Sequence, residues 1–396
     1  MRLTFLISVT KITLWICFSS AVILCTSYAQ ESEQNYIIGK AIKIRSAVLN
    51  EERTLLINLP DDYDVSQRRY PVLFLLDGDA HFHHVTGIVH FFTVRNMIPP
   101  LIVIALPNID RTRDFSPTSI DKRLTSGGAD RFLEFFQEEL IPYVDSHYRT
   151  FPYRIIIGHS LGGLFAIYAL LTQPDVFNAY IAISPSLSYD NELLLKKAPA
   201  FLEKSPELKK FLFMTVGNEP KYIPRLESFS KILEEMAPEG LEWKYTYMEK
   251  EDHVSITHRS IYDGLETLYL DWRVSASLIQ KGLDGIQEHY RTLSEKFGYE
   301  IPVLPRVYNL LGYDLIKKKK MNEAIEVFEL CINDYPLYWY AYSNLGYCYM
   351  LEGNKELAIK NLEKALELNP SDRISAQRLK KLKEEKISTL DNTEKE

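Results

Sequence analysis

The chain has 396 residues, of which 46% are hydrophobic and 25% charged, a composition typical of a globular protein with about two domains. Its formal net charge of −7 argues against nucleic acid as a partner and against a basic membrane-binding surface. Only Cys331 and Cys348 lie beyond the N-terminal segment, so the protein has no disulfide framework and its core must depend on hydrophobic burial.

The N-terminal segment, residues 1–29, has the features of a signal peptide. Arg2 and Lys11 are its only charged residues, and residues 12–24 are apolar. Ser27-Tyr28-Ala29 fits the small-x-small cleavage pattern, which makes Gln30 the first mature residue. An uncleaved membrane anchor is the alternative, although the apolar run is short for a full span. We therefore expect an exported protein, either periplasmic or secreted.

The segment that follows predicts an α/β sheet. Residues 36–59 alternate polar and apolar side chains, which predicts an antiparallel hairpin with its turn near residues 50–52. Short continuous apolar runs are typical of buried parallel strands, and they occur at residues 71–76, 101–106, 154–157 and 211–216. Helix-length segments separate these runs, at residues 129–144, 162–171 and 226–236. Residues 241–248 alternate and predict a strand near the edge of the sheet. This succession of strands and helices indicates a mostly parallel sheet covered by helices on both faces.

The strand signals end near Trp272, and the rest of the chain is predicted to be helical. Residues 275–297 predict one helix. Residues 305–336 and 339–370 then align at a period of 34, which resembles two tetratricopeptide repeats. The matched pairs are Tyr308 and Tyr342, Leu311 and Leu345, Gly312 and Gly346, Leu315 and Tyr349, Ala324 and Ala358, Phe328 and Leu362, Cys331 and Ala365, and Pro336 and Pro370.

Small residues in the repeats let the two helices of each hairpin approach closely, and the prolines end the second helix. Two repeats bury little surface alone, so we expect helices before and after them to cap the stack. Cys331 and Cys348 lie in this region, where we expect two buried free thiols, with a disulfide between them as the alternative.

A catalytic motif lies between a predicted strand and a predicted helix. Gly158-His159-Ser160-Leu161-Gly162 fits G-x-S-x-G, the pattern of a nucleophile elbow, in which a sharp turn exposes the serine above the sheet edge. The two glycines permit the turn and a close approach of strand and helix. A serine hydroxyl at neutral pH needs an adjacent base, and the base needs an orienting acid.

The base and the acid are expected after the serine in the chain, in the order acid and then histidine. His253 follows the last predicted strand and precedes a predicted helix at residues 255–269, whereas the competing His258 would lie inside that helix. Glu219 follows the strand at residues 211–216, at the carboxyl edge where site residues gather. Glu227 and Asp252 are the alternative acids, and a Ser-His dyad without an acid would also work.

The oxyanion hole needs two backbone N–H groups. We expect one from Leu161, the residue after the nucleophile. The other is expected from Gly78 or Asp79, in the loop after residues 71–76, because Gly78 lets the backbone turn its amide inward.

Two further clusters of polar residues lie near these loops. His81, His83 and His84 form an H-x-H-H group without a carboxylate partner at helical spacing, so we expect a pocket rim or loop surface rather than a metal site. Arg111 and Arg113 follow the strand at residues 101–106, where they would bind an anionic substrate. In the alternative, Arg113 pairs with Asp114 or Asp110 and braces the loop.

With these residues, the chain is similar to the "putative esterase" family of α/β-hydrolases, in its esterase-D-like and enterochelin-esterase-like branch. The resemblance spans roughly residues 36–272, and its motifs are YPVLFLLDGD at residues 70–79, PNIDRTRD at 107–114, GHSLGG at 158–163 and Asp252-His253. It implies a serine esterase that uses Ser160 and His253.

Members of the family hydrolyse siderophore esters, feruloyl and acetyl esters of plant polysaccharides, or S-formylglutathione, and some are mycolyltransferases. The Leu-Asp-Gly-Asp form of the oxyanion loop resembles the siderophore-esterase branch. The acid varies within the family, and that branch includes enzymes with a dyad, so the resemblance leaves the role of Glu219 open.

The sequence therefore predicts an α/β-hydrolase fold followed by an all-α tetratricopeptide-repeat domain. The expected parts are a signal peptide at 1–29, an esterase domain at 30–273, a linker and capping helix at 274–304, and two repeats with a capping helix at 305–385. The expected reaction is hydrolysis of a small-molecule or glycan-linked ester through an acyl-enzyme, without a cofactor or metal. The repeats would bind a protein partner or mediate self-association. An acyltransferase with the same site, and a repeat-based scaffold with a relic hydrolase, are the alternatives.

Overall fold

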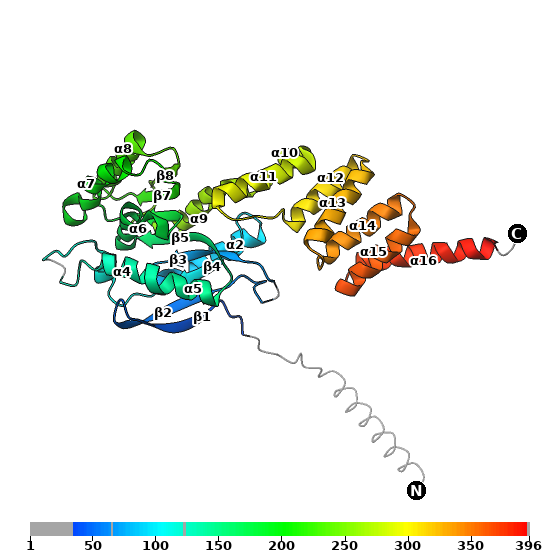
Figure 1. The fold of residues 1–396 in the computed structure, drawn as a ribbon, viewed down its shortest axis with the longest axis horizontal. Coiled ribbons are helices and arrows are strands. Elements are labelled where there is room, and N and C mark those ends of the chain that lie inside the picture. The colour runs from blue at the N-terminus through cyan, green and yellow to red at the C-terminus, as the bar shows by residue number, and fades with distance from the viewer. Residues whose placement is uncertain (1–34, 65, 122–123, 394–396) are drawn as a thin grey trace, which may run out of the picture. The chain divides into compact units, whose positions relative to one another are not determined.

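The computed structural model of the chain describes residues 35–64, 66–121 and 124–393 (Figure 1). Residues Gly39–Glu396 form one compact unit, and the expected signal peptide lies outside the described residues. Within the described ranges, no helix combines the length and the apolar character that crossing a membrane requires.

One eight-stranded sheet organises the first part of this unit, in the order β1-β2-β4-β3-β5-β6-β7-β8. Its strands are β1 (Lys40–Ser46), β2 (Glu51–Asn58), β3 (Tyr70–Leu75), β4 (Ile102–Ala105), β5 (Thr150–His159), β6 (Ala179–Ile183), β7 (Lys210–Gly217) and β8 (Leu241–Met248). The pairs β1–β2 and β2–β4 are antiparallel, and all the other neighbours are parallel. The carboxyl ends of β3 to β8 therefore meet at one edge of the sheet, where the loops that carry the candidate site begin.

The N-terminal hairpin forms as the alternating pattern predicts, but its turn comes earlier than residues 50–52. The turn occupies residues 47–50, and β2 already begins at Glu51. Asn50 ends the turn with a φ of 54°, in the left-handed region that asparagine tolerates better than most residues.

Helices cover both faces of the sheet (Figure 1). One face packs against α4 (Ala129–Phe135), α5 (Ile141–His147), α6 (Leu161–Thr172), α7 (Tyr189–Glu203) and α8 (Ile223–Met236). The other face packs against α2 (Gly78–Val94), α9 (Ile256–Leu268) and α11 (Gly282–Phe297).

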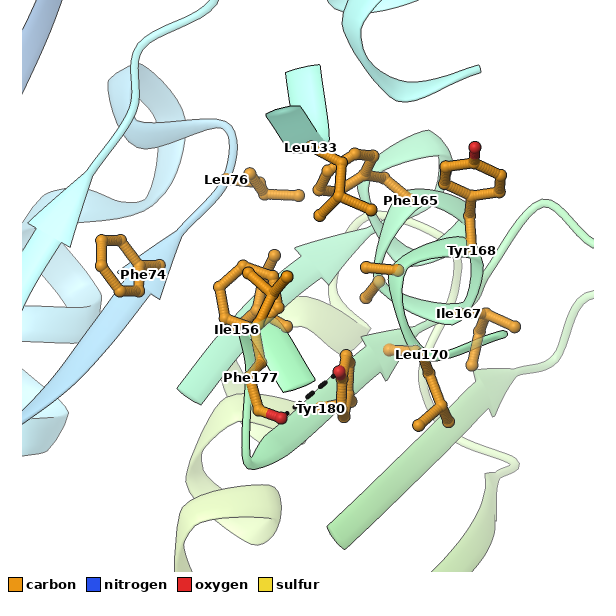
Figure 2. Packing of buried hydrophobic residues seen from close by; sticks show 14 of the residues in the cluster. Phe74, Leu76, Leu133, Ile156, Phe165, Ile167, Tyr168, Leu170, Phe177 and Tyr180 are labelled. Carbon is orange, nitrogen blue, oxygen red and sulfur yellow. Dashed lines mark hydrogen bonds between the residues drawn. The ribbon is translucent and has the colours of Figure 1, made fainter. Parts of the chain in front are cut away.

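Alternate residues of the central strands point into two separate cores, as the period of a strand requires. In β5, Ile156 belongs to one core, whereas Ile155 and Ile157 belong to the other. Figure 2 shows the first core, in which Phe74 and Ile156 of the sheet and Phe165 of α6 are among the packed side chains. All three side chains are at most 1% exposed, so this packing holds α6, and with it the elbow, firmly on the sheet.

Two of the predicted helices are interrupted, and each interruption has a local cause. The helix predicted at residues 129–144 contains a π-helical turn, Phe136–Leu140, before α5. Pro142 has no N–H to continue the hydrogen-bond ladder at that point. The helix predicted at residues 275–297 divides into α10 (Ala276–Gln280) and α11, because Gly282 takes a φ of 74°.

The C-terminal part consists of helical hairpins. They are formed by α12 (Pro305–Lys317) with α13 (Met321–Asp334), and by α14 (Trp339–Leu351) with α15 (Lys355–Leu368), and α16 (Arg373–Thr393) follows. A Cβ on Gly312 would lie 2.3 Å from the Phe328 ring, and one on Gly346 would lie 2.8 Å from Leu362. The small residues at these positions are therefore required by the close approach of the helices.

Cys331 and Cys348 are buried free thiols, as expected. Burial raises the pKa of each thiol to about 12, because the thiolate would lose its hydration. Both residues thus act as small apolar side chains of the repeat core.

Helix α11 joins the repeats to the sheet through aromatic contacts. The ring of Phe297 stacks on Tyr269 at 5.1 Å between centroids and meets the edge of Tyr153 at 5.1 Å. Tyr299 stacks on Phe151 at 4.0 Å. The second core continues through these rings into α12–α14, so the two parts share buried apolar surface.

A buried ion pair anchors the short helix α3 (Arg111–Phe115) to β2. Arg53 Nη2 lies 2.6 Å from Asp114 Oδ2, and both side chains are 2% exposed. Arg53 also meets Glu51 at 2.6 Å, and its guanidinium lies 5.2 Å from the centroid of the Phe132 ring. Because both charges are removed from water, loss of either partner would leave the other charge buried with one partner fewer and would destabilise the fold.

We expect Asp114→Ala to lower the free energy of unfolding by about 3 kcal/mol, because it leaves Arg53 buried with one partner fewer. Urea denaturation would measure the loss. The double variant Arg53→Met with Asp114→Leu should recover most of it, since neither charge is then buried. A loss below about 1 kcal/mol, typical of an exposed pair, would contradict this account.

Candidate active site

Ser160 lies in a sharp turn between β5 and α6. Its backbone has φ 59° and ψ −112°, a combination that an L-residue adopts only when its surroundings impose it. A Cβ on Gly158 would lie 2.2 Å from the carbonyl oxygen of Gly162, so strand and helix touch at these glycines. This geometry exposes the Ser160 hydroxyl at the carboxyl edge of the sheet, as a nucleophile elbow requires.

His253 contacts the Ser160 side chain. Its Nε2 lies 3.0 Å from Ser160 Oγ, within hydrogen-bond reach. The loop between β8 and α9 that carries His253 is held by Asp252, whose carboxylate accepts the N–H groups of Val254 and Ser255 at 2.8 Å each. Asp252 is thus committed to its own loop and does not contact the imidazole as an acid would.

Glu219 contacts the other nitrogen of the same imidazole. Its Oε2 is hydrogen-bonded to His253 Nδ1. Its Oε1 accepts from Ser184 Oγ at 2.6 Å and from the N–H of Gly217 at 3.0 Å. The side chain is 7% exposed, and these bonds fix it in one orientation. Glu227, the alternative acid, is exposed on α8 and has no contact with His253 among the described hydrogen bonds.

Three residues that the sequence did not single out complete the surroundings of Ser160 and His253. The rings of His159 and Tyr222 lie 4.6 Å and 4.8 Å from the His253 ring. Ser186 Oγ lies 3.4 Å from Ser160 Oγ. His159 occupies the first variable position of the motif and could have been noticed, whereas Tyr222 and Ser186 carry no sequence signal of their own.

The structure narrows the choice of oxyanion donors. The N–H of Gly78 donates to the carbonyl of Leu106 at 2.9 Å, so the expectation that it serves as a donor is wrong. Gly78 is needed instead for close packing, because a Cβ there would lie 2.8 Å from the nitrogen of Leu106. The N–H groups of Asp79 and Leu161 have no acceptor among the described residues, and both stay predictions as donors.

Asp77 connects the loop that follows β3 to the turn that carries Ser160. It is buried, takes a φ of 54°, and accepts hydrogen bonds from Asn108 at 2.7 Å and from Arg111 Nε at 2.5 Å. Arg111 Nη2 reaches Asp77 Oδ2 at 3.1 Å and the carbonyl of His159 at 2.9 Å. One guanidinium thus ties both loops together.

The expectation that Arg111 and Arg113 bind an anionic substrate is therefore not supported. The Nε–H and Nη2–H groups of Arg111 donate to protein acceptors. Arg113 donates to Glu51 at 2.6 and 3.0 Å and to Asp114 at 2.8 Å. The alternative expectation, that Arg113 braces its loop, fits these contacts. A guanidinium whose N–H groups already bind protein acceptors has few donors left for a ligand.

The histidines of the H-x-H-H group belong to a chain of imidazoles beside the site. His81 Nδ1 lies 3.1 Å from His84 Nε2, and His84 Nδ1 lies 3.3 Å from His258 Nδ1. His83 is exposed and is not part of this row of imidazoles. His84 uses both nitrogens on different neighbours, and no group of three His, Cys, Asp or Glu side chains in the described ranges is arranged to hold a metal ion.

Burial keeps the rings of His84 and His159 neutral. It lowers the pKa of His84 to about 4, and the neighbouring His81 and His258 add to the effect. It also lowers the pKa of His159 to about 4, with further contributions from His253 and His81. Near neutral pH both rings are uncharged, so they place no positive charge beside His253.

Comparison with known proteins identifies both parts of the chain. Residues 46–217 match the family model described as "Putative esterase", and residues 305–333 and 339–372 match models of the tetratricopeptide repeat. The ferri-bacillibactin esterase BesA of Bacillus subtilis is 31% identical over 250 residues, which cover 56% of this chain and 86% of the relative. A siderophore triacetylfusarinine C esterase of Aspergillus fumigatus is 27% identical over 250 residues, which cover 54% of this chain and 86% of that relative.

Solved structures share the fold. An IroE-like serine hydrolase from Shewanella oneidensis has a TM-score of 0.66 and 29% identity, over 74% of this chain and 99% of that one. An uncharacterised protein from Capnocytophaga ochracea has a TM-score of 0.63 at 15% identity and covers 87% of this chain, a likeness of fold alone. The predicted α/β-hydrolase fold followed by tetratricopeptide repeats is thereby confirmed.

The low pKa of His84 predicts a pH dependence of stability. A group whose pKa falls from about 6.5 in the unfolded chain to about 4 in the folded one stabilises the fold above pH 6.5 and loses that contribution as the pH falls toward 4. The thermal midpoint of wild type should therefore fall more steeply over this interval than that of His84→Gln. Imidazole resonances should show His84 titrating near pH 4, and titration near 6.5 would contradict the assignment.

Proposed function

The chain belongs to the "Putative esterase" family and is a carboxylic ester hydrolase, and we propose that it acts by a serine mechanism carried by Ser160, His253 and Glu219. The observation that supports this most directly is the contact between Ser160 Oγ and His253 Nε2, at 3.0 Å, on a strained turn. A nucleophile within hydrogen-bond reach of a base, which is itself oriented by an acid, is the general arrangement for acyl transfer.

In the proposed reaction, His253 Nε2 accepts the proton of Ser160 as Oγ attacks the ester carbonyl carbon. The resulting oxyanion is stabilised by the N–H groups of Leu161 and Asp79. His253 then donates the proton to the leaving alcohol, and an acyl-enzyme remains. Water, deprotonated by His253, attacks the acyl-enzyme, and Ser160 recovers its proton as the organic acid leaves.

Glu219 would hold His253 in the tautomer whose Nε2 is free to accept a proton. Its contact with Nδ1 favours an N–H at that position, and its charge stabilises the imidazolium that forms during the reaction. The bonds from Ser184 and Gly217 support this role, since they prevent the carboxylate from turning away.

The substrate we propose is an ester of a siderophore, and polysaccharide-linked esters are the competing class. The support comes from two relatives, one named a ferri-bacillibactin esterase and the other a siderophore triacetylfusarinine C esterase, and from the Leu-Asp-Gly-Asp sequence at residues 76–79.

We also propose that the protein is exported and that the repeats bind a protein partner or another copy of the chain. Export is supported by the charge and apolar pattern of residues 1–29. The role of the repeats is supported by the extended surfaces that stacked helical repeats generally present.

We expect Ser160→Ala and His253→Gln each to lower kcat on an activated ester by about 10⁴-fold or more, because the triad acts as a unit. A fluorophosphonate probe should label wild type and fail to label Ser160→Ala. Glu219→Gln should lower kcat with little change in KM, because the carboxylate acts through His253 rather than on the substrate.

Two matched variants serve as controls. His258→Gln and Glu227→Gln remove the alternative base and acid that the sequence offers, and both should retain kcat within about threefold. If Glu227→Gln lost activity and Glu219→Gln did not, the acid assignment would be wrong. Persistent labelling of Ser160→Ala would refute the nucleophile.

A panel of esters would test the proposed substrate class. Ferric siderophore lactones, feruloylated and acetylated oligosaccharides, and a simple aryl acetate would be compared by kcat/KM, with products identified by mass spectrometry. We expect the siderophore ester to exceed the oligosaccharide esters by at least about tenfold, equivalent to about 1.4 kcal/mol of transition-state binding. Transfer of the acyl group to an added alcohol in preference to water would instead indicate the acyltransferase.

A further inference from the structure

A cavity separate from the candidate active site lies where α2 ends and α12 begins. Its volume is about 520 Å³, within the range of small-molecule sites. Its lining residues come from the end of α2, the segment after α9, α11 and α12: Phe91, Arg95, Asn96, Met97, Trp272, Arg273, Val274, Tyr290, Leu304, Arg306, Val307 and Leu310. None of them is a residue of the Ser160 site.

All the charged residues that line this cavity are cationic. Arg95, Arg273 and Arg306 line it, and no aspartate or glutamate does. Among the residues that the structure describes, Arg95 and Arg306 form no ion pair with a carboxylate, and Arg273 reaches Glu266 only at 3.8 Å. Three arginines that line one space, in a chain of net charge −7, favour an anion with oxygen acceptors.

The remaining wall is apolar. Met97, Tyr290 and Val307 are buried beneath it, and two large apolar side chains, Phe91 and Leu310, line the cavity while 44% and 45% exposed. An apolar wall next to cationic groups suits a ligand that has both an acidic head and an apolar body.

A buried donor without an acceptor lies on the same wall. Trp272 is 4% exposed, and its indole Nε1–H has no partner among the described atoms. The same side chain lines a neighbouring cavity of about 230 Å³, which also shares Asn96 and Leu304 with the larger one. Leaving a buried N–H unsatisfied is costly, and only a small rearrangement of the cavity wall would let a ligand oxygen reach it.

We propose that this cavity is a binding site for an organic acid with an apolar body. The acid group would bind Arg95 and Arg306, and the apolar body would pack against Phe91, Met97 and Leu310. The volume suits a small molecule. Hydrolysis of an ester also releases a carboxylic acid, so the reaction of this enzyme itself supplies a ligand of that class. The proposal concerns a site beyond ester cleavage and does not depend on the role of Ser160.

Titration calorimetry on the full mature chain would test the proposal with decanoate and 2-naphthoate, and with decanamide as the uncharged match. We expect the acids to bind at least about tenfold more tightly than the amide, and to bind less tightly as salt is raised. The double variant Arg95→Gln with Arg306→Gln should lower the affinity for the acids at least about tenfold, while the rate of ester hydrolysis stays unchanged.

Three further variants separate the outcomes. Leu310→Glu, which adds a negative charge to the wall, should also weaken binding. Arg131→Gln, at an exposed position of α4 away from the cavity, should not change it. Ser160→Ala should bind the acids as wild type does. The proposal is overturned if the double variant binds normally, if Ser160→Ala alone loses binding, or if the protein ignores the acids and sediments with phosphatidylglycerol vesicles.

Discussion

The close contact between β5 and α6 at Gly158 and Gly162 is the constraint on which the rest of the site depends. With a side chain at Gly158 the strand and the helix could not meet, because its Cβ would overlap the carbonyl of Gly162. The contact forces Ser160 into a strained backbone conformation, and the packing of α6 on the sheet maintains the strain. In return, the hydroxyl stands clear of the sheet edge, where a loop from β8 can reach it.

Two buried carboxylates stabilise the loops around that turn. Asp77 accepts from Asn108 and Arg111, and Arg111 also holds the carbonyl that precedes Ser160. Glu219 accepts from Ser184 and Gly217 on one oxygen and contacts His253 with the other. Each charge has its hydrogen-bonding capacity largely satisfied, which is the condition for burying it near a site that must keep its geometry. The nearby His84 and His159 add no charge, because burial keeps them neutral.

The repeats are joined to the hydrolase by shared apolar surface as well as by the chain itself. The rings of Tyr153, Tyr269 and Phe297 lie in the same core as the first residues of α12. The cavity lined by three arginines lies at this junction and takes its walls from both parts. A ligand there would contact both, and binding would therefore respond to how the two are packed.

Local patterns in the sequence were enough to predict the α/β-hydrolase sheet, the repeats and the residues Ser160, Glu219 and His253 in their order. These features depend on periodicity and on short motifs with strict backbone demands, and both are visible along a single chain. Only the tertiary structure decided what the neighbours of each side chain are. It assigned Arg111 and Arg113 to internal carboxylates, committed the amide of Gly78 to Leu106, and brought Tyr222 and Ser186 to the site. These contacts join residues from different loops, and hydrogen-bond partners across such distances depend on packing that no local pattern encodes.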